Sequence, residues 1–188
     1  MFFIIGISSG AFTVKSLSDS HKQELISYMK GFFHILSNRS IDEFSVLKQS
    51  LANNLQTSAM IWLLGITVVG IPLILLLIAI RGFIIGFTVG FLADQMGFKG
   101  ALFSFIAILP QNILIVPGIL VIGVIGIGFS TMIIKNKLRK KTINHDSTFK
   151  QFILYSTIIL FICFIISIGC FIEAYVTPVF MRLLSTYM

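Results

Sequence analysis

The fold class is decided by the stretch RGFIIGFTVGFLADQMGFKGALFSFIAILPQNILIVP, which covers residues 81–117. It is apolar enough to lie in a bilayer, yet it opens on an arginine and ends on Pro-Gln-Asn between apolar residues. A helix that only anchors a protein to a membrane needs neither feature. Non-helical backbone at membrane depth survives only where protein or water surrounds it. The polar segment is therefore the strongest functional candidate in the chain.

Glycines recur through this stretch at helical spacing. Gly82, Gly86 and Gly90 lie four residues apart and so share one face of a helix. Because lipid offers no hydrophobic force between helices, small residues that let two backbones approach closely stabilise helix pairs in membranes. We predict that these three glycines and Gly100 pack helices together, either within the bundle or between two copies of the chain in a homodimer.

Two prolines, Pro110 and Pro117, bracket the polar segment. Each lacks a backbone N–H and breaks or kinks a helix. The surrounding uncharged run of residues 101–134 would reach about 51 Å as one straight helix, far beyond a hydrocarbon core of about 30 Å. We therefore predict a break in this span at Pro110, Gln111, Asn112 and Pro117. The two amide side chains either satisfy the backbone groups that the break frees or face a partner.

The composition excludes a soluble domain, since 56% of the 188 residues are apolar and only 11% are charged. The net charge is +7, and much of it lies in one short segment, residues 135–151. Basic residues that separate two apolar runs in this way are typical of a cytoplasmic loop. Binding of nucleic acid is a poor alternative, because no nucleic-acid-binding module surrounds the basic residues.

These features predict an all-α fold, a polytopic integral membrane bundle with about five spans, one of them broken or kinked, and an extracytoplasmic helical hairpin. The basic loop fixes the orientation of the other segments through the positive-inside rule. The predicted order is a first transmembrane helix over 1–14 that starts part-way into its span, an amphipathic hairpin over 15–57, spans two to four over 58–134, the basic cytoplasmic loop over 135–151, span five over 152–176 and an extracytoplasmic tail over 177–188.

Residues that carry chemistry are sparse. The histidines fall outside the apolar runs, and the sequence has no nucleophile with a matching base, no phosphate-binding glycine loop and no metal-spaced His/Cys group. Cys163 and Cys170 lie two helical turns apart, too far for a disulfide, and are expected to be packing residues. Asp94 is expected to pair with Lys99 at the membrane interface. We therefore expect no catalytic residue, no cofactor and no metal site, and a protein that is not an enzyme.

Several motifs of the central stretch and the C-terminal region match one known family, namely Arg81-Gly82-Phe83, GFTVGFL at 86–92, Lys99-Gly100, LPQN…P at 109–117, and Glu173-Ala174-Tyr175 followed by Thr177-Pro178. In these motifs the chain resembles the stage II sporulation protein M family. The resemblance runs from residue 58 to about residue 180. It implies that Arg81 marks a cytoplasmic turn after a second span over residues 58–80. It also implies that Glu173, Thr177 and Pro178 lie at a membrane end and face a packing neighbour or a partner.

The resemblance implies a membrane scaffold for forespore engulfment during sporulation. Family members act with the stage II sporulation proteins D and P, a lytic transglycosylase and an amidase/endopeptidase that remodel septal peptidoglycan. The implied role is to localise and orient these two partners in the mother-cell or septal membrane, among membrane lipids and without nucleic acid. The alternative is a permease-like subunit for a small solute or lipid, which the broken span and the basic loop fit loosely.

Overall fold

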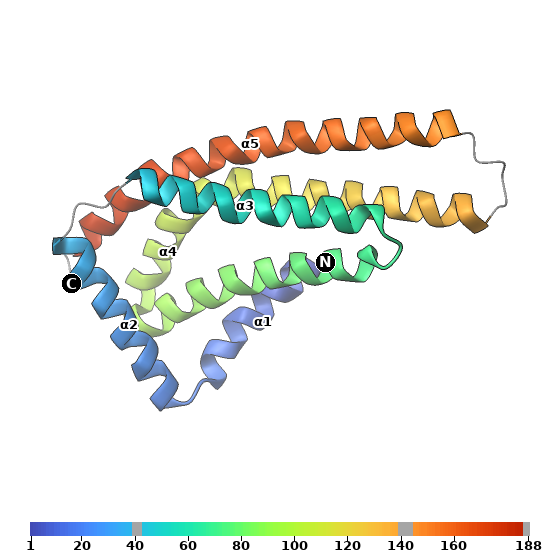
Figure 1. Cartoon of the computed structure of the whole chain (residues 1–188). Helices are drawn as coiled ribbons and strands as arrows, with labels where there is room; N and C mark the ends of the chain where they lie inside the picture. The colour runs from blue at the N-terminus through green and yellow to red at the C-terminus, as the bar shows by residue number, and fades with distance from the viewer. Residues whose placement is uncertain (39–42, 139–144, 186–188) are drawn as a thin grey trace.

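A computed structural model of the chain describes residues 1–38, 43–138 and 145–185. These residues form five helices: α1, Phe2–Ser16; α2, Asp19–Asn38; α3, Glu43–Ile66; α4, Gly70–Leu138; and α5, His145–Ser185. No strand occurs in the described ranges, which confirms the predicted all-α class. Figure 1 shows α3, α5 and the second half of α4 running side by side, with α1 and the first half of α4 beneath them.

Within the described residues, three helical segments are long and apolar enough to cross a membrane: Gly70–Phe98, Pro110–Asn136 and Phe149–Tyr175. Helix α1 is apolar but shorter. Large apolar side chains on these segments face outward, among them Ile84 and Phe164, as suits contact with lipid. The chain is therefore a multi-pass helical membrane protein, while the count of five spans stays a prediction.

Helix α4 reverses direction at Gly97, the one residue of this 69-residue helix whose backbone is not helical, with φ 60° and ψ −140°. Glycine adopts such a positive φ readily because it has no Cβ to clash. A Cβ on Gly100 would lie 1.9 Å from the carbonyl oxygen of Leu92, so the reversal also needs glycine at this position. After this turn the yellow-green part of α4 rises across the end of the bundle and bends again, so that the last part of α4 runs antiparallel to the first (Figure 1).

Pro110 and Pro117 lie inside α4, so the helix is not broken at the polar segment, and of the predicted break or kink only a kink remains. A proline removes one helical hydrogen bond, and neighbouring helices and polar side chains compensate for this loss in a membrane bundle. Figure 1 shows the ribbon bending between its yellow-green and yellow parts rather than ending there. The uncharged run of residues 101–134 is longer than one span. Its first residues are helical but precede the candidate span, which begins at Pro110.

The second predicted span, residues 58–80, is also wrong, because the chain turns within it. The backbone N–H of Thr67 donates to the carbonyl oxygen of Leu64 at 3.0 Å, and α4 begins at Gly70. A Cβ on Gly70 would lie 1.7 Å from the same carbonyl oxygen, so this turn requires glycine. Pro72 then falls in the first turn of α4, where its missing N–H removes no helical hydrogen bond.

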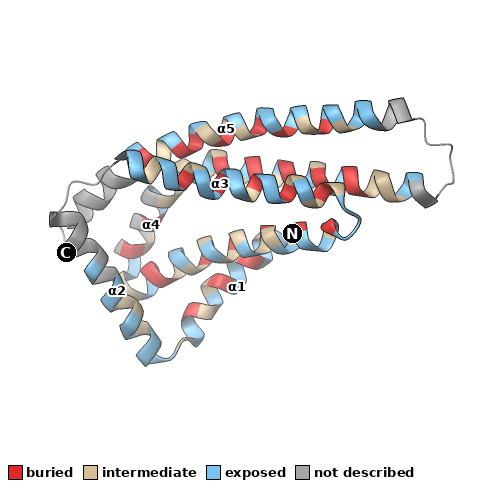
Figure 2. Ribbon diagram, in the orientation of Figure 1, coloured by how far each residue is buried: buried red, intermediate tan, exposed pale blue. Residues whose placement is uncertain are grey.

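The core of the bundle consists mainly of isoleucines from α3, both halves of α4, and α5. They recur every three or four residues, so that one stripe of each helix faces its neighbours. Figure 2 shows buried residues along these facing sides. Near one end of the bundle the rings of Phe129 and Tyr155 stack with their centroids 4.4 Å apart. The isoleucines with less than about 2% exposure are Ile61, Ile74, Ile115, Ile119, Ile122 and Ile166.

Helix α3 belongs to this bundle and is not the second arm of a separate hairpin. Its buried face carries Ser50, Asn54, Ser58 and Ile61, and it packs against α4 and α5. The predicted boundary at residue 57 therefore cuts through a continuous helix. The extracytoplasmic position of α2 stays a prediction.

Candidate functional site

Five residues form a cluster of polar contacts that joins α3, α4 and α5 inside the bundle. The guanidinium of Arg81 on α4 donates a hydrogen bond to the amide oxygen of Asn54 on α3. One turn earlier on α3, Ser50 Oγ donates to a carboxylate oxygen of Glu173 on α5. Asn54 Nδ2 donates to Ser50 Oγ at 3.3 Å and to Cys170 Sγ at 3.4 Å. We call these five residues the polar cluster.

Arg81 lies within α4, about three turns after the helix begins, so its predicted place at a cytoplasmic turn is wrong. It follows an uncharged run, which makes it resemble the end of a span, but the turn comes earlier, at residues 67–69. Arg81 is half-buried, and the negative charge of Glu173 offsets part of the cost of burying its positive charge. Charged side chains inside membrane bundles face the interior or a water-filled cavity and bind one another. Arg81 has this environment.

Asn54 is the buried centre of the polar cluster, with 2% of the residue exposed. Its amide nitrogen also donates to the carbonyl oxygen of Ser50 at 3.0 Å, while its amide oxygen accepts from Arg81. A buried amide is costly unless its donors and acceptors are bonded. In the part of the chain that the structure describes, no buried side-chain nitrogen or oxygen lacks a hydrogen-bond partner. The cluster therefore links three helices without leaving a buried polar atom unsatisfied.

A cavity of about 240 Å³ opens beside the polar cluster. Its polar lining comprises Arg81, Thr88, Gln111, Asn112 and Glu173, and its apolar lining consists of isoleucines of α4. Asn112 Nδ2 donates to a carbonyl oxygen of the preceding helical turn at 2.7 Å, so this amide both satisfies backbone and borders the cavity. The structure thus brings together four residues that the sequence had singled out separately.

Ser50, Asn54 and Cys170 were not predicted as site residues. Ser50, Asn54 and Ser58 recur four residues apart and therefore share one helix face. Small and polar residues on one face are typical of helices that pack together within a membrane. This signal was available, but the amphipathic pattern of residues 15–57 had placed the segment outside the membrane.

The predicted packing glycines of α4 lie against α1. A Cβ on Gly82 would lie 2.3 Å from the carbonyl oxygen of Phe3, and a Cβ on Gly86 would lie 2.1 Å from that of Ile7. Gly90 meets the next turn of α1, so α1 and the first half of α4 run parallel at very close range. Helix α1 fills this face, which is therefore not open to a second copy of the chain.

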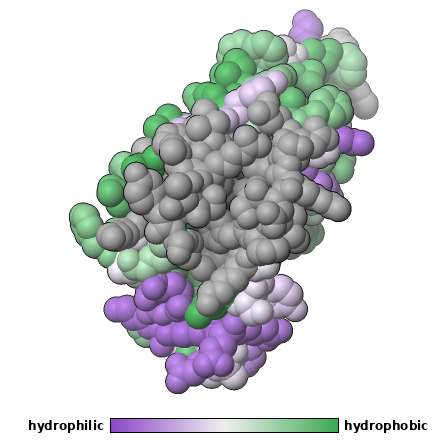
Figure 3. Space-filling model, turned by 90° about the vertical axis from the view of Figure 1, so that its left-hand side faces the viewer, coloured by the Kyte–Doolittle hydropathy of each residue, from purple (hydrophilic) through white to green (hydrophobic). Residues whose placement is uncertain are grey.

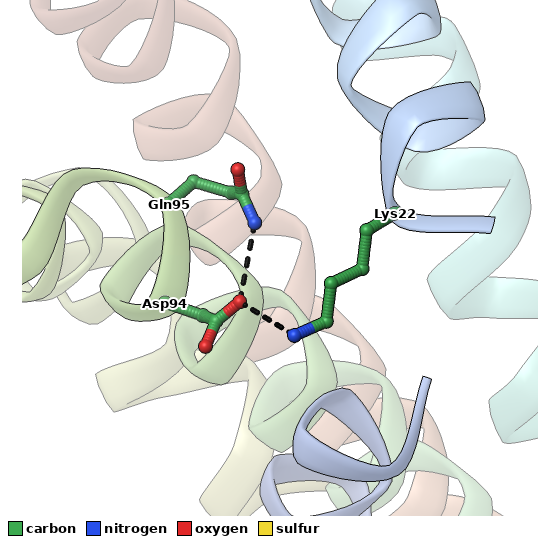
Figure 4. Close-up of polar contacts among 3 residues, drawn as sticks. All are labelled: Lys22, Asp94 and Gln95. Carbon is green, nitrogen blue, oxygen red and sulfur yellow. Dashed lines mark hydrogen bonds and ion pairs between the residues drawn. The ribbon is translucent and has the colours of Figure 1, made fainter. Parts of the chain in front are cut away.

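Asp94, which was expected to pair with Lys99, pairs with Lys22 at the start of α2. Figure 4 shows Lys22 Nζ and Gln95 Nε2 both directed at Asp94 Oδ2, each at 3.1 Å. The side chain of Lys99 lies outside the described part of the structure. The pair ties α2 to the end of the first half of α4.

The remaining predicted site residues contribute less. Pro117 is exposed on α4, and the side chains of Thr177 and Pro178 lie outside the described residues. Cys163 is half-buried and Cys170 is buried, both as free thiols. Among the described residues, no group of three or more His, Cys, Asp or Glu side chains is able to hold a metal ion.

The helices and the polar cluster define a class of protein, namely a multi-pass helical membrane protein whose spans enclose an arginine and a glutamate. The chain belongs to the stage II sporulation protein M family, because the family model matches residues 1–178. This match confirms the resemblance and extends it to α1 and α2. No curated protein and no solved structure matches the chain. The protein is therefore a sporulation-related membrane protein.

Proposed function

We propose that the protein is a non-enzymatic scaffold that localises and orients the stage II sporulation proteins D and P during engulfment. The observation that carries this proposal is the family match over residues 1–178. The partners would remodel septal peptidoglycan, while this chain holds them in the mother-cell or septal membrane. The polar cluster fits such a role, because its groups bond one another between helices as a structural link does.

The orientation that suits the proposal places the basic end of the bundle in the cytoplasm. The turn between α3 and α4 and the facing ends of α4 and α5 lie at one end of the molecule, and the α1–α2 turn and the end of the first half of α4 lie at the other (Figure 1). Lys135 and Lys150 are exposed at the first end, which the positive-inside rule assigns to the cytoplasm. The other end would then face the septal peptidoglycan.

The start of α2 is the described surface best placed to contact partners there. Figure 3 views the molecule from this end and shows hydrophilic residues gathered along its lower part. Glu24 is exposed, and Tyr28 is 70% exposed. Both residues line a groove that is completed by Phe87 of α4. An exposed tyrosine beside charged residues is well suited to a protein interface.

The proposal is tested by co-purification of the tagged, detergent-solubilised protein from sporulating cells, with mass spectrometry of what accompanies it. Deleting residues 15–57 is too crude, because it removes Ser50 and Asn54 from the bundle. The sharper variant is Glu24→Lys combined with Tyr28→Ala, which leaves the bundle intact. The matched control is Val69→Ser, which alters a residue 69% exposed at the opposite end.

Loss of both peptidoglycan hydrolases from the α2 variant, with recovery by Val69→Ser as by the unaltered protein, supports the scaffold and its surface. Recovery of neither hydrolase with the unaltered protein contradicts the scaffold proposal itself. Recovery of both hydrolases with the α2 variant contradicts only the assignment of the contact surface.

A permease-like subunit is the second candidate, and the cavity beside Arg81 and Glu173 is the observation that favours it. Transporters place charged and polar groups inside their spans, where they bind solute. This candidate predicts that a nucleotide-binding protein contacts the basic segment around residues 135–150. Specific solute flux into liposomes that contain the purified protein would favour it over the scaffold.

A further inference from the structure

The cavity beside the polar cluster presents a cation and an anion between isoleucine walls. Arg81 and Glu173 both line it, together with Thr88 and the amides of Gln111 and Asn112. Its volume of about 240 Å³ corresponds to about eight water molecules at about 30 Å³ each. A polar cavity of this size has room for a small charged group as well as for water.

The cavity lies close to the boundary of two spans. Gln111 and Asn112 stand within one helical turn, about 5 Å, of the start of the span Pro110–Asn136. Glu173 stands equally close to the end of the span Phe149–Tyr175. These two spans are antiparallel neighbours, because Gly169 near the end of one packs against Ile115 near the start of the other. The third wall of the cavity comes from Arg81, Ile84 and Thr88, which lie within the span Gly70–Phe98.

The cavity is accessible from the side of the bundle. Ile84 on its rim is 54% exposed, and Thr88, one turn further along α4, is exposed as well. Both belong to a segment apolar enough to cross a membrane, so their exposed surfaces face lipid. A molecule that reaches the cavity by this route comes from the bilayer and carries an apolar part.

The charged groups retain bonding capacity toward the cavity. Among the described residues, the Arg81 guanidinium donates to Asn54, which uses one of its several N–H groups. Within the same described residues, one carboxylate oxygen of Glu173 accepts from Ser50, which leaves the second oxygen. The lining therefore offers donors at one position and an anionic acceptor at another, with no net charge.

We propose that this cavity binds the head group of a phospholipid that carries a primary ammonium group, that is, a phosphoethanolamine lipid. The phosphate oxygens accept hydrogen bonds from Arg81, whose planar guanidinium suits phosphate. The ammonium group donates to the remaining carboxylate oxygen of Glu173. The acyl chains pass Ile84 into the bilayer. A choline head group has no N–H to donate, and a glycerol head group has no positive charge, so both fit less well.

The test is native mass spectrometry of the full chain in detergent, titrated with equal amounts of phosphatidylethanolamine and phosphatidylcholine. We expect about tenfold stronger retention of phosphatidylethanolamine, the change that one charge-assisted hydrogen bond produces. Glu173→Gln keeps an acceptor for Ser50 and removes the anion. It should abolish the preference between the two lipids, which a purely structural role of Glu173 would not do.

A second variant addresses the place of binding. Ile84→Trp puts an indole ring at the rim of the cavity and should prevent retention of phosphatidylethanolamine. The control Ile80→Trp lies one turn earlier on the same helix, is 45% exposed and does not line the cavity, so retention should persist. Unchanged retention by Ile84→Trp would overturn the assignment.

Two further outcomes also overturn the proposal. If the unaltered protein retains both lipids equally, the proposal is overturned. This result does not depend on whether a variant folds. Competition by free phosphoethanolamine at the same concentration as the lipid would mean that the ligand is a soluble zwitterion. Weak competition supports a ligand held partly by its acyl chains. The scaffold role does not depend on any of these results.

Discussion

Arg81 on α4 is hydrogen-bonded to Asn54 on α3 across the bundle, although 27 residues separate them in the chain. The bond closes a loop that contains the α3–α4 turn and sets the register of the two helices. Through Ser50, the same region of α3 is bonded to Glu173 on α5, 123 residues away. A charged side chain is tolerated at this depth because its partners come from helices on two sides.

Replacing Asn54 by leucine should lower the free energy of unfolding by about 2–3 kcal/mol. The substitution removes the acceptor of Arg81 and leaves a half-buried cation with an unsatisfied donor. Thermal unfolding of the purified protein in detergent measures the change.

The control for this variant is Asn53→Leu, one residue earlier on α3. Asn53 is exposed and accepts a hydrogen bond from Gln49 at 3.3 Å. Its replacement should change the free energy of unfolding by no more than about 0.5 kcal/mol. Equal losses for the two variants would mean that the bond between Arg81 and Asn54 does not stabilise the bundle.

The helical class and the membrane location follow from apolar runs that are visible in the sequence, but the ends of the helices do not. Pro110 and Pro117 suggested a break, yet a proline removes only one hydrogen bond and bends a helix that its neighbours support. Reversal of the chain needs a positive φ, which Gly97 supplies. Glycines are frequent in this stretch, and nothing local distinguishes the one that turns the chain.

The candidate site was predictable in part. Arg81, Gln111 and Asn112 stood out because polar residues are costly in apolar surroundings, and Glu173 stood out through the family resemblance. Their meeting at one cavity depends on the fold of α4 back on itself, which periodicity along the chain does not reveal. Asn54 was missed for a related reason. A segment of mixed polar and apolar residues is interpreted as a surface helix when the helices that pack against it are unknown.

Replacing Gly97 by alanine should destabilise the protein by about 1–3 kcal/mol, because a φ of 60° with a ψ of −140° is almost closed to residues with a Cβ. An added Cβ meets no atom within 4 Å there, so the cost comes from the backbone alone. The control is Gly128→Ala, where an added Cβ also meets nothing but the backbone is helical. That variant should unfold at the same or a higher temperature. A stable Gly97→Ala protein would refute the reversal at this residue.

Replacing Gly86 by leucine should separate α1 from α4. The new Cβ would lie 2.1 Å from the carbonyl oxygen of Ile7, a backbone atom that cannot rotate away. Overpacking of this kind costs about 1–3 kcal/mol or more, and thermal unfolding will report it.

Gly128→Leu adds the same side chain in open space on the same helix and should be tolerated. If both variants unfold alike, the glycine face is not what holds α1. If the hydrolases co-purify unchanged with Gly86→Leu, the scaffold does not need that contact.

The ion pair between Lys22 and Asp94 should contribute little to stability and should depend on salt. Its side chains are 20% and 33% exposed, and partly exposed pairs of this kind are worth about 0.2–1 kcal/mol. Lys22→Met should therefore lower the free energy of unfolding by that amount at low ionic strength. At about 1 M salt, where the Debye length is about 3 Å, the difference from the unaltered protein should shrink. Asp94→Ala should cost at least as much, because it also removes the acceptor of Gln95. A double-mutant cycle isolates the pair. A loss that salt leaves unchanged would show that Lys22 stabilises α2 through the packing of its stem and not through its charge.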